Sequence, residues 1–167
     1  VTRSNEALLE DEVQRGKEAI YRFLGRLVLA YSLYGADNPR YADGAIANCK
    51  LAPIIYPGWL VWIYHDNKVS AHLLDQLKAC PSVRLIDMSH EHDIPPMAWR
   101  FLPAANPYIK AFIARDIDSR LSMREKRAVD EWLASDNTFH VMRDHPSHSK
   151  YPISGGMWGA RGGSING

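Results

Sequence analysis

The stretch "KAFIARDIDSR" (residues 110–120) joins an apolar run to a pair of acids. The apolar residues 111–114 are typical of a buried β-strand, and Arg115, Asp116 and Asp118 follow them. Residues i and i+2 at the end of a strand point to the same side, so the two carboxylates are expected to lie together. Because like charges repel at short range, either both acids face water in a loop or a cation lies between them. Oxygen ligands of this kind suit magnesium or manganese.

Apolar runs and helix signals alternate along the rest of the chain. Strands are predicted within residues 26–35, 59–66, 82–88, 108–118 and 139–144. Helices are predicted at residues 43–55, 70–80, 95–105 and 122–135. Ser70 is the expected N-cap of the second helix, and Ser122 with Glu125 fits a capping box. This alternation predicts an α/β sandwich with a mostly parallel sheet.

Polar residues cluster where the predicted strands end. They are Ser32 to Gly35, His65 and Asp66, Asp116 to Asp118, and Arg143 and Asp144. In parallel sheets, ligands bind beyond the carboxyl ends of the strands. A single site at this edge of the sheet is therefore expected.

Composition limits the class of protein. The chain has 167 residues, of which 46% are hydrophobic and 23% are charged, and its formal net charge is +1. These values suit one globular domain with a core and argue against a broad nucleic-acid-binding surface. No apolar run is long enough to span a membrane, and no signal peptide is visible.

The N-terminal segment differs in character from the rest. Residues 5–26 show roughly helical apolar spacing, so residues 1–26 are predicted to form an amphipathic helix or linker. Residues 27–167 are predicted to form the main domain. Because the sequence stops in the Gly-rich stretch "GGMWGARGGSING", we expect this domain to be incomplete at its C-terminus.

The two cysteines, Cys49 and Cys80, match no metal-binding or redox spacing. We expect them to be unpaired, small buried residues in a reducing compartment, which favours a cytoplasmic location.

Several motifs together resemble one enzyme family. They are "SLYG", "NPRYADGAIAN", "LAPIIYPGW", "MAWRFLPA", "ARDIDSR", "FHVMRDHPSH" and "GGMWGAR". This combination is similar to small GT-A glycosyltransferases, a family that includes the glycosyltransferase domain of a large chlorella-virus protein. The resemblance implies a GT-A three-layer sandwich and transfer of a sugar from a nucleoside-diphosphate donor, such as a UDP-sugar, to a carbohydrate or glycan acceptor.

The resemblance also implies roles for individual residues. Asp116 and Asp118 would bind Mn²⁺ or Mg²⁺, and a third metal ligand would lie beyond residue 167. The nucleotide-sugar would contact residues from four parts of the chain. These are Ser32, Leu33, Tyr34 and Gly35; Arg100; Arg115 and Asp116; and Gly155, Gly156 and Trp158. Arg115 would either reach a donor phosphate or pair with an acid. Trp158 would act as a stacking platform within a Gly-rich wall.

Asp144 is the expected catalytic residue, taking the proton from the acceptor hydroxyl; its alternative role is a hydrogen bond to the donor sugar. Since no motif resembles the nucleophile of a double displacement, inversion at the anomeric carbon is expected.

Other classes of function fit less well. A non-catalytic nucleotide-sugar-binding or interaction domain is the main alternative. A metal-dependent phosphohydrolase lacks a nucleophile at the expected position. Zinc at His140, His145 and His148 is disfavoured because no cysteine is near and the three lie on a strand and a loop. The oligomeric state and the identity of the sugar cannot be predicted from these patterns.

Overall fold

The computed structural model describes residues 12–17, 24–35, 38–143 and 145–165. Residues 12–17 are helical and exposed, and the remainder of the predicted N-terminal helix lies largely outside the described residues. Within the described part of the chain, no helix is long and apolar enough to cross a membrane.

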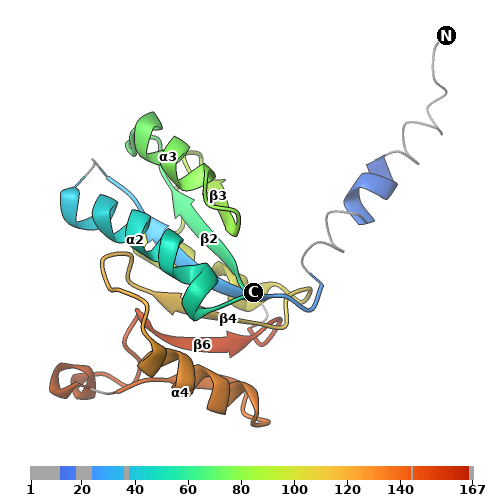
Figure 1. Cartoon of the computed structure of the whole chain (residues 1–167). Helices are drawn as coiled ribbons and strands as arrows, with labels where there is room; N and C mark the ends of the chain where they lie inside the picture. The colour runs from blue at the N-terminus through green and yellow to red at the C-terminus, as the bar shows by residue number, and fades with distance from the viewer. Residues whose placement is uncertain (1–11, 18–23, 36–37, 144, 166–167) are drawn as a thin grey trace.

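A six-stranded sheet forms the centre of the domain (Figure 1). The strands are β1 (Leu27–Leu33), β2 (Leu60–His65), β3 (Val83–Asp87), β4 (Ala111–Arg115), β5 (Phe139–Val141) and β6 (Met157–Arg161). Their order is β3-β2-β1-β4-β6-β5. The first four are parallel, and β6 is antiparallel to both β4 and β5. The α/β class and the mostly parallel sheet are confirmed.

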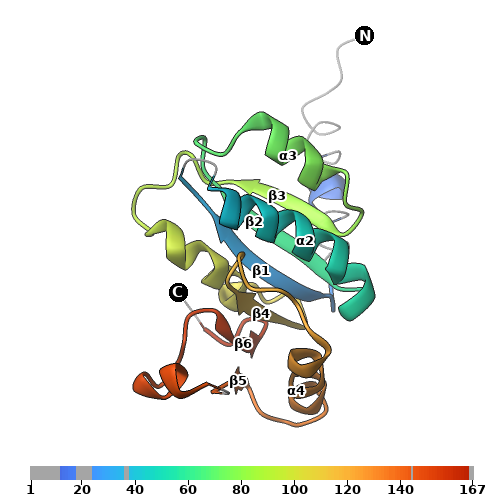
Figure 2. The same ribbon diagram turned by 60° about the vertical axis from the view of Figure 1, so that its left-hand side comes forward.

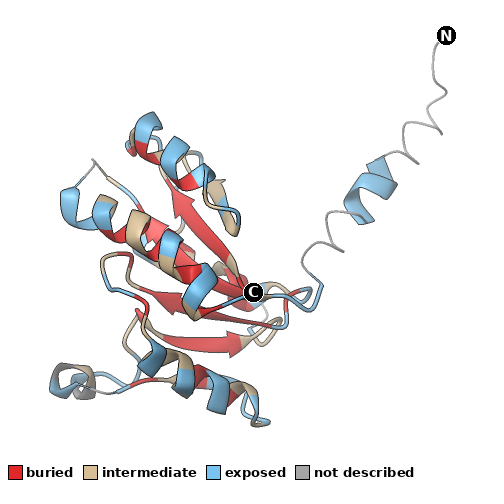
Figure 3. Cartoon of the chain, in the orientation of Figure 1, coloured by how far each residue is buried: buried red, intermediate tan, exposed pale blue. Residues whose placement is uncertain are grey.

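Helical layers cover both faces of this sheet (Figure 2). One face carries α2 (Pro39–Ile55), α3 (Ala71–Lys78) and α4 (Met123–Leu133), and the other carries the 3₁₀ helix η1 (Pro96–Ala105). The strands alternate side chains between two apolar clusters, one under the α-helices and one under η1. The sheet is consequently the buried middle layer (Figure 3).

The predicted caps of two helices are confirmed. The Ser70 hydroxyl accepts a hydrogen bond from the backbone N–H of Leu73, and that of Ser122 accepts one from Glu125. Helix α2, however, begins before the predicted start at residue 43. The side chain of Asn38 caps it, and Pro39 occupies its first turn, where a missing N–H costs nothing.

The expectation of two unpaired cysteines is wrong. Cys49 on α2 and Cys80, just after α3, form a disulfide with their Cα atoms 6.1 Å apart. A separation of 31 residues gives no local signal for such a bond, because only the packing of α2 beside α3 brings the two thiols together.

The prediction of a Gly-rich wall around Trp158 is also wrong in part. Met157–Arg161 does not form a loop but strand β6. Trp158 is buried, and its ring packs against Phe101 and Phe112 with centroids 5.3 and 5.1 Å away. It fills the core beside η1 and is not exposed as a stacking platform.

His140 on β5 provides a test by pH. It is buried and stacks on Trp132, and burial lowers its pKa from 6.5 to about 4. Between these values the unfolded chain binds a proton that the folded chain does not, so stability should fall as the pH drops from 6.5 towards 4. We expect His140→Phe to flatten this part of a denaturant-unfolding profile measured against pH. An unchanged profile would show that His140 is not responsible.

Candidate functional site

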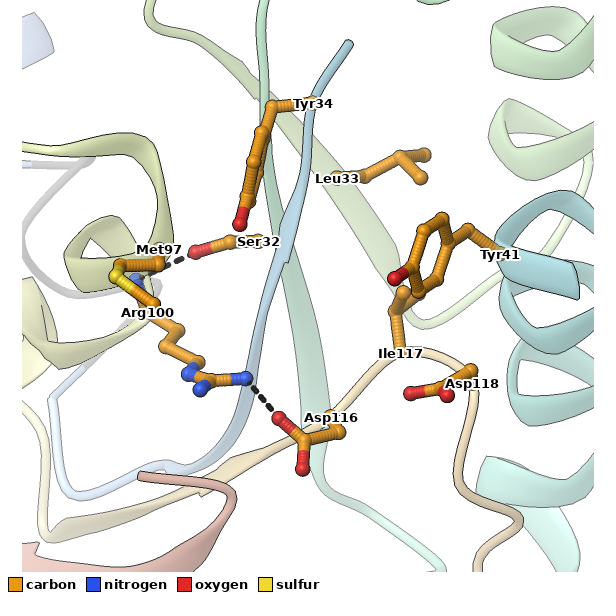
Figure 4. Close-up of a pocket in the computed structure, with 9 residues that line it drawn as sticks. All are labelled: Ser32, Leu33, Tyr34, Tyr41, Met97, Arg100, Asp116, Ile117 and Asp118. Atoms are coloured by element: carbon orange, nitrogen blue, oxygen red, sulfur yellow. Dashed lines mark hydrogen bonds and ion pairs between the residues drawn. The ribbon is translucent and has the colours of Figure 1, made fainter. Parts of the chain in front are cut away.

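A cleft of about 330 Å³ lies at the carboxyl ends of β1 and β4 (Figure 4). Its lining comes from Ser32 and Leu33 at the end of β1, Tyr34 just after it, and Asp116–Asp118 after β4. Met97 and Arg100 come from η1, and Tyr41 comes from α2. The chain runs from β1 to β2 on one side of β1 and returns from β3 to β4 on the other. The cleft therefore lies where the strand order reverses, which is the usual ligand position in open α/β sheets.

Asp116 is held at this position by Arg100. The side chain of Asp116 is 48% exposed, and one of its carboxylate oxygens lies 2.5 Å from the guanidinium of Arg100. The same guanidinium donates to the backbone carbonyl of Arg115, and the backbone N–H of Arg100 donates to the hydroxyl of Ser32. These contacts tie η1 to the ends of both central strands and bring an arginine to the mouth of the cleft.

Asp118 is more enclosed, with 14% of its side chain exposed. Its carboxylate lies 2.6 Å from the guanidinium of Arg40, whose own side chain is 74% exposed. This pair joins an exposed arginine to an enclosed carboxylate, so Asp118 has a cationic partner in this structure.

Asn48 fixes the loop that carries Asp118. This fully buried side chain on α2 donates to the carbonyls of Ile117 and Ser119, at 3.0 and 2.7 Å, and accepts from the N–H of Leu121 at 3.0 Å. One turn earlier on α2, a Cβ at Gly44 would overlap the backbone of Ile117 and Asp118. Helix α2 thus sets the position of the second acid.

We expect Asn48→Ala to destabilise the domain by about 2–4 kcal/mol, because it leaves two carbonyls and an N–H in the loop without their present partner. Chemical denaturation measures this loss, and the exposed Lys50→Ala on the same helix is the control. A loss below about 0.5 kcal/mol would contradict the anchoring role.

Aromatic side chains form the other end of the cleft. The rings of Tyr34 and Tyr41 enter it from the end of β1 and from α2 (Figure 4). Tyr34 is 43% exposed and packs edge-on against the buried Trp99. Gly35 follows with φ +84°, and its N–H donates to the carboxylate of Asp66 at 3.0 Å. The turn is thus held while the tyrosine rings remain available for stacking.

Arg115 does not line the cleft; of its two expected roles, contact with the donor or pairing with an acid, the structure shows the second. It is fully buried, with its Nε 3.5 Å from a carboxylate oxygen of Glu125 on α4. Its Nη1 donates to the backbone carbonyls of Ala114 and Trp158. Its role in this structure is to tie β4 to β6 and α4.

Gly155 and Gly156 do lie beside the predicted site residues. A Cβ at Gly156 would overlap the carboxylate of Asp116, and one at Gly155 would lie 3.0 Å from the guanidinium of Arg100. Asp144 lies outside the described residues.

The charged oxygen groups of this cleft that could bind a metal ion are the carboxylates of Asp116 and Asp118. Asp116 and Asp118 both line it, so the side chains present fit a hard divalent cation that takes its other ligands from water or a phosphate. Among the described residues, no group of three or more His, Cys, Asp and Glu side chains is placed to hold a metal ion.

Tyr41, Met97 and Asn48 were not predicted as site residues. The pair Asn38-Pro39 is a helix-start signal that could have placed Tyr41 on α2 near the strand ends. An asparagine next to the apolar residues of "GAIA" (residues 44–47) was a comparable signal for Asn48.

No protein-family model matches this chain, and no curated protein matches it.

Proposed function

We propose that this chain is a metal-dependent glycosyltransferase domain of the GT-A type, which takes a nucleoside-diphosphate sugar as donor. The observation that carries the proposal is the content of one cleft at the strand-order reversal, where two carboxylates, an arginine and two tyrosines meet. The motif resemblance of "ARDIDSR", "FHVMRD" and "GGMWGAR" supports the same assignment.

Each part of the donor has a matching group in the cleft. Tyr34 and Tyr41 offer aromatic faces for the base. Asp116 and Asp118 would hold the metal ion, which neutralises the charge that grows on the diphosphate as it leaves. Arg100, whose backbone N–H bonds the hydroxyl of Ser32, would donate hydrogen bonds from its guanidinium to the phosphates or the sugar.

The reaction exchanges one bond for another. The acceptor oxygen attacks the anomeric carbon, the bond from that carbon to the diphosphate oxygen breaks, and its electron pair leaves with the diphosphate. The hydroxyl proton passes to a base, for which Asp144 is proposed, and attack opposite the leaving group inverts the anomeric centre.

We expect Asp144→Asn to lower the transfer rate by about 10²–10⁴-fold and to leave donor affinity unchanged, since a lost base affects only the proton transfer. The measurement is product formation from UDP-sugars, with NMR assignment of the product anomer. Asp136→Asn, an exposed acid in the turn before β5, is the control.

A wild-type rate in Asp144→Asn, or retention of configuration, would refute the role of Asp144. Metal-dependent nucleotide binding without any transfer would instead identify a non-catalytic nucleotide-sugar-binding domain.

A further inference from the structure

Helix α2 carries several of the groups that shape the candidate site. Its first turn provides Arg40, which pairs with Asp118, and Tyr41, which lines the cleft. Its middle provides Asn48, whose side chain holds the backbone around Asp118 through three hydrogen bonds. A shift of α2 would therefore disturb the aromatic end of the cleft and the loop of the second acid together.

The buried face of α2 consists of small residues. They are Gly44, Ala45, Asn48, Cys49 and Ala52. The larger apolar side chains of Leu51 and Ile55 are only partly buried, and Ile54 is 73% exposed. Because hydrophobic stabilisation grows with the apolar area removed from water, small buried side chains contribute little of it. Packing alone therefore anchors α2 less firmly than a face of large apolar residues would.

The Cys49–Cys80 disulfide adds a covalent anchor between α2 and the residue just after α3. Cys49 directly follows Asn48, so the bond is attached one residue from the side chain that holds the loop. Pro53 has no N–H to donate to the carbonyl of Cys49, four residues earlier. The disulfide thus restrains α2 at a point where the helix lacks one of its own hydrogen bonds.

We propose that this disulfide is a redox control on the candidate site, which binds nucleotide and metal tightly when the bond is formed and weakly when it is reduced. The inference rests on the proposed nucleotide-sugar function. Reduction frees α2 from α3, which weakens the hold of Asn48 on the loop that carries Asp118 and the position of Tyr41 in the cleft.

The reductant is a dithiol, and the reaction is thiol–disulfide exchange. Cys49 is 2% exposed whereas Cys80 is only partly buried, so a thiolate of the reductant attacks Sγ of Cys80. The S–S bond breaks, and its electron pair leaves on Sγ of Cys49, which takes up a proton. The second thiol of the reductant then attacks the mixed disulfide and releases Cys80, which also takes up a proton. The reductant ends as a disulfide and the two cysteines end as thiols.

The first measurement follows backbone amide signals by NMR in oxidised protein and in protein reduced with dithiothreitol. The N–H of Leu121 donates to the side chain of Asn48, so its signal should shift or broaden on reduction. The signals of Phe139–Val141 are the control, because β5 is an edge strand separated from β4 by β6, and they should stay in place.

The second measurement is calorimetric titration with UDP and magnesium, at a temperature where circular dichroism shows that the reduced protein is folded. We expect the oxidised protein to bind UDP at least about fivefold more tightly than the reduced protein, which is the lower end of typical coupling between two sites. Cys49→Ala/Cys80→Ala should bind like the reduced protein and should not respond to dithiothreitol.

Three results would overturn the inference. They are an unchanged Leu121 signal on reduction, equal UDP affinity in the two redox states, and loss of the folded state on reduction at every temperature, which would make the bond purely structural. If the oxidised protein binds UDP with magnesium, the proposed function stands whichever of these occurs. If neither redox state binds UDP with magnesium, the proposed function fails, and redox control of nucleotide binding fails with it.

Discussion

Reduction of the Cys49–Cys80 disulfide is expected to lower the free energy of unfolding by about 3–4 kcal/mol. The bond closes a loop with a sequence separation of 31 residues, and a loop of that length restricts the unfolded chain by about this amount in the chain-entropy model. For a domain of this size the melting temperature should fall by about 6–16 °C. Melting curves with and without a thiol reductant measure the change.

The double variant Cys49→Ala/Cys80→Ala separates the bond from side effects of the reductant. It should melt close to the reduced wild type and should not respond to reductant. Equal melting temperatures for oxidised and reduced wild-type protein would show that the disulfide contributes nothing. Because Cys49 is adjacent to Asn48, the same experiment with UDP present would report whether the bond also supports the loop that carries Asp118.

Replacement of either acid in the cleft is expected to have the largest effect on function. Asp116→Asn and Asp118→Asn should each lower metal-dependent affinity for a nucleoside diphosphate by about 100-fold or more, because an amide oxygen lacks the charge that holds a divalent ion. Asp118 should matter at least as much as Asp116, since it is the more enclosed of the two and its loop is anchored by Asn48.

The control for these variants is Asp75→Asn, because Asp75 is an exposed acid on α3 that does not line the cleft. All three variants should retain the melting temperature of the wild type to within a few degrees. Wild-type affinity in Asp116→Asn and Asp118→Asn would disprove the metal site, whereas a large fall in melting temperature would indicate that the loss of binding came from unfolding.

Local patterns predicted the parallel part of the fold. The runs that became β1, β2 and β4 are nearly continuous apolar segments, as expected for strands covered on both faces. Ser70 and Ser122 marked the starts of α3 and α4 because their capping contacts involve neighbours within three residues.

Features that depend on distant contacts were missed. Strand β6 exists because Met157–Arg161 pairs with β4, and Gly159 within it weakens the strand signal. The burial of Trp158 and of Arg115 follows from that pairing and from the packing of α4, neither of which is visible in a short stretch of sequence.

In the candidate site, too, residues marked by local patterns could be predicted and residues brought in by distant contacts could not. Asp116, Asp118 and Tyr34 could be predicted because each lies close behind an apolar run in the sequence. Tyr41 and Asn48 reach the cleft and its loop only through the packing of α2 against the end of β4.

The most direct test of the account is calorimetric titration of the wild-type chain with UDP, in the presence and absence of Mn²⁺. The account predicts saturable 1:1 binding that requires the metal and is lost in Asp118→Asn. Binding of UDP with equal affinity with and without Mn²⁺, or no binding under either condition, would contradict it.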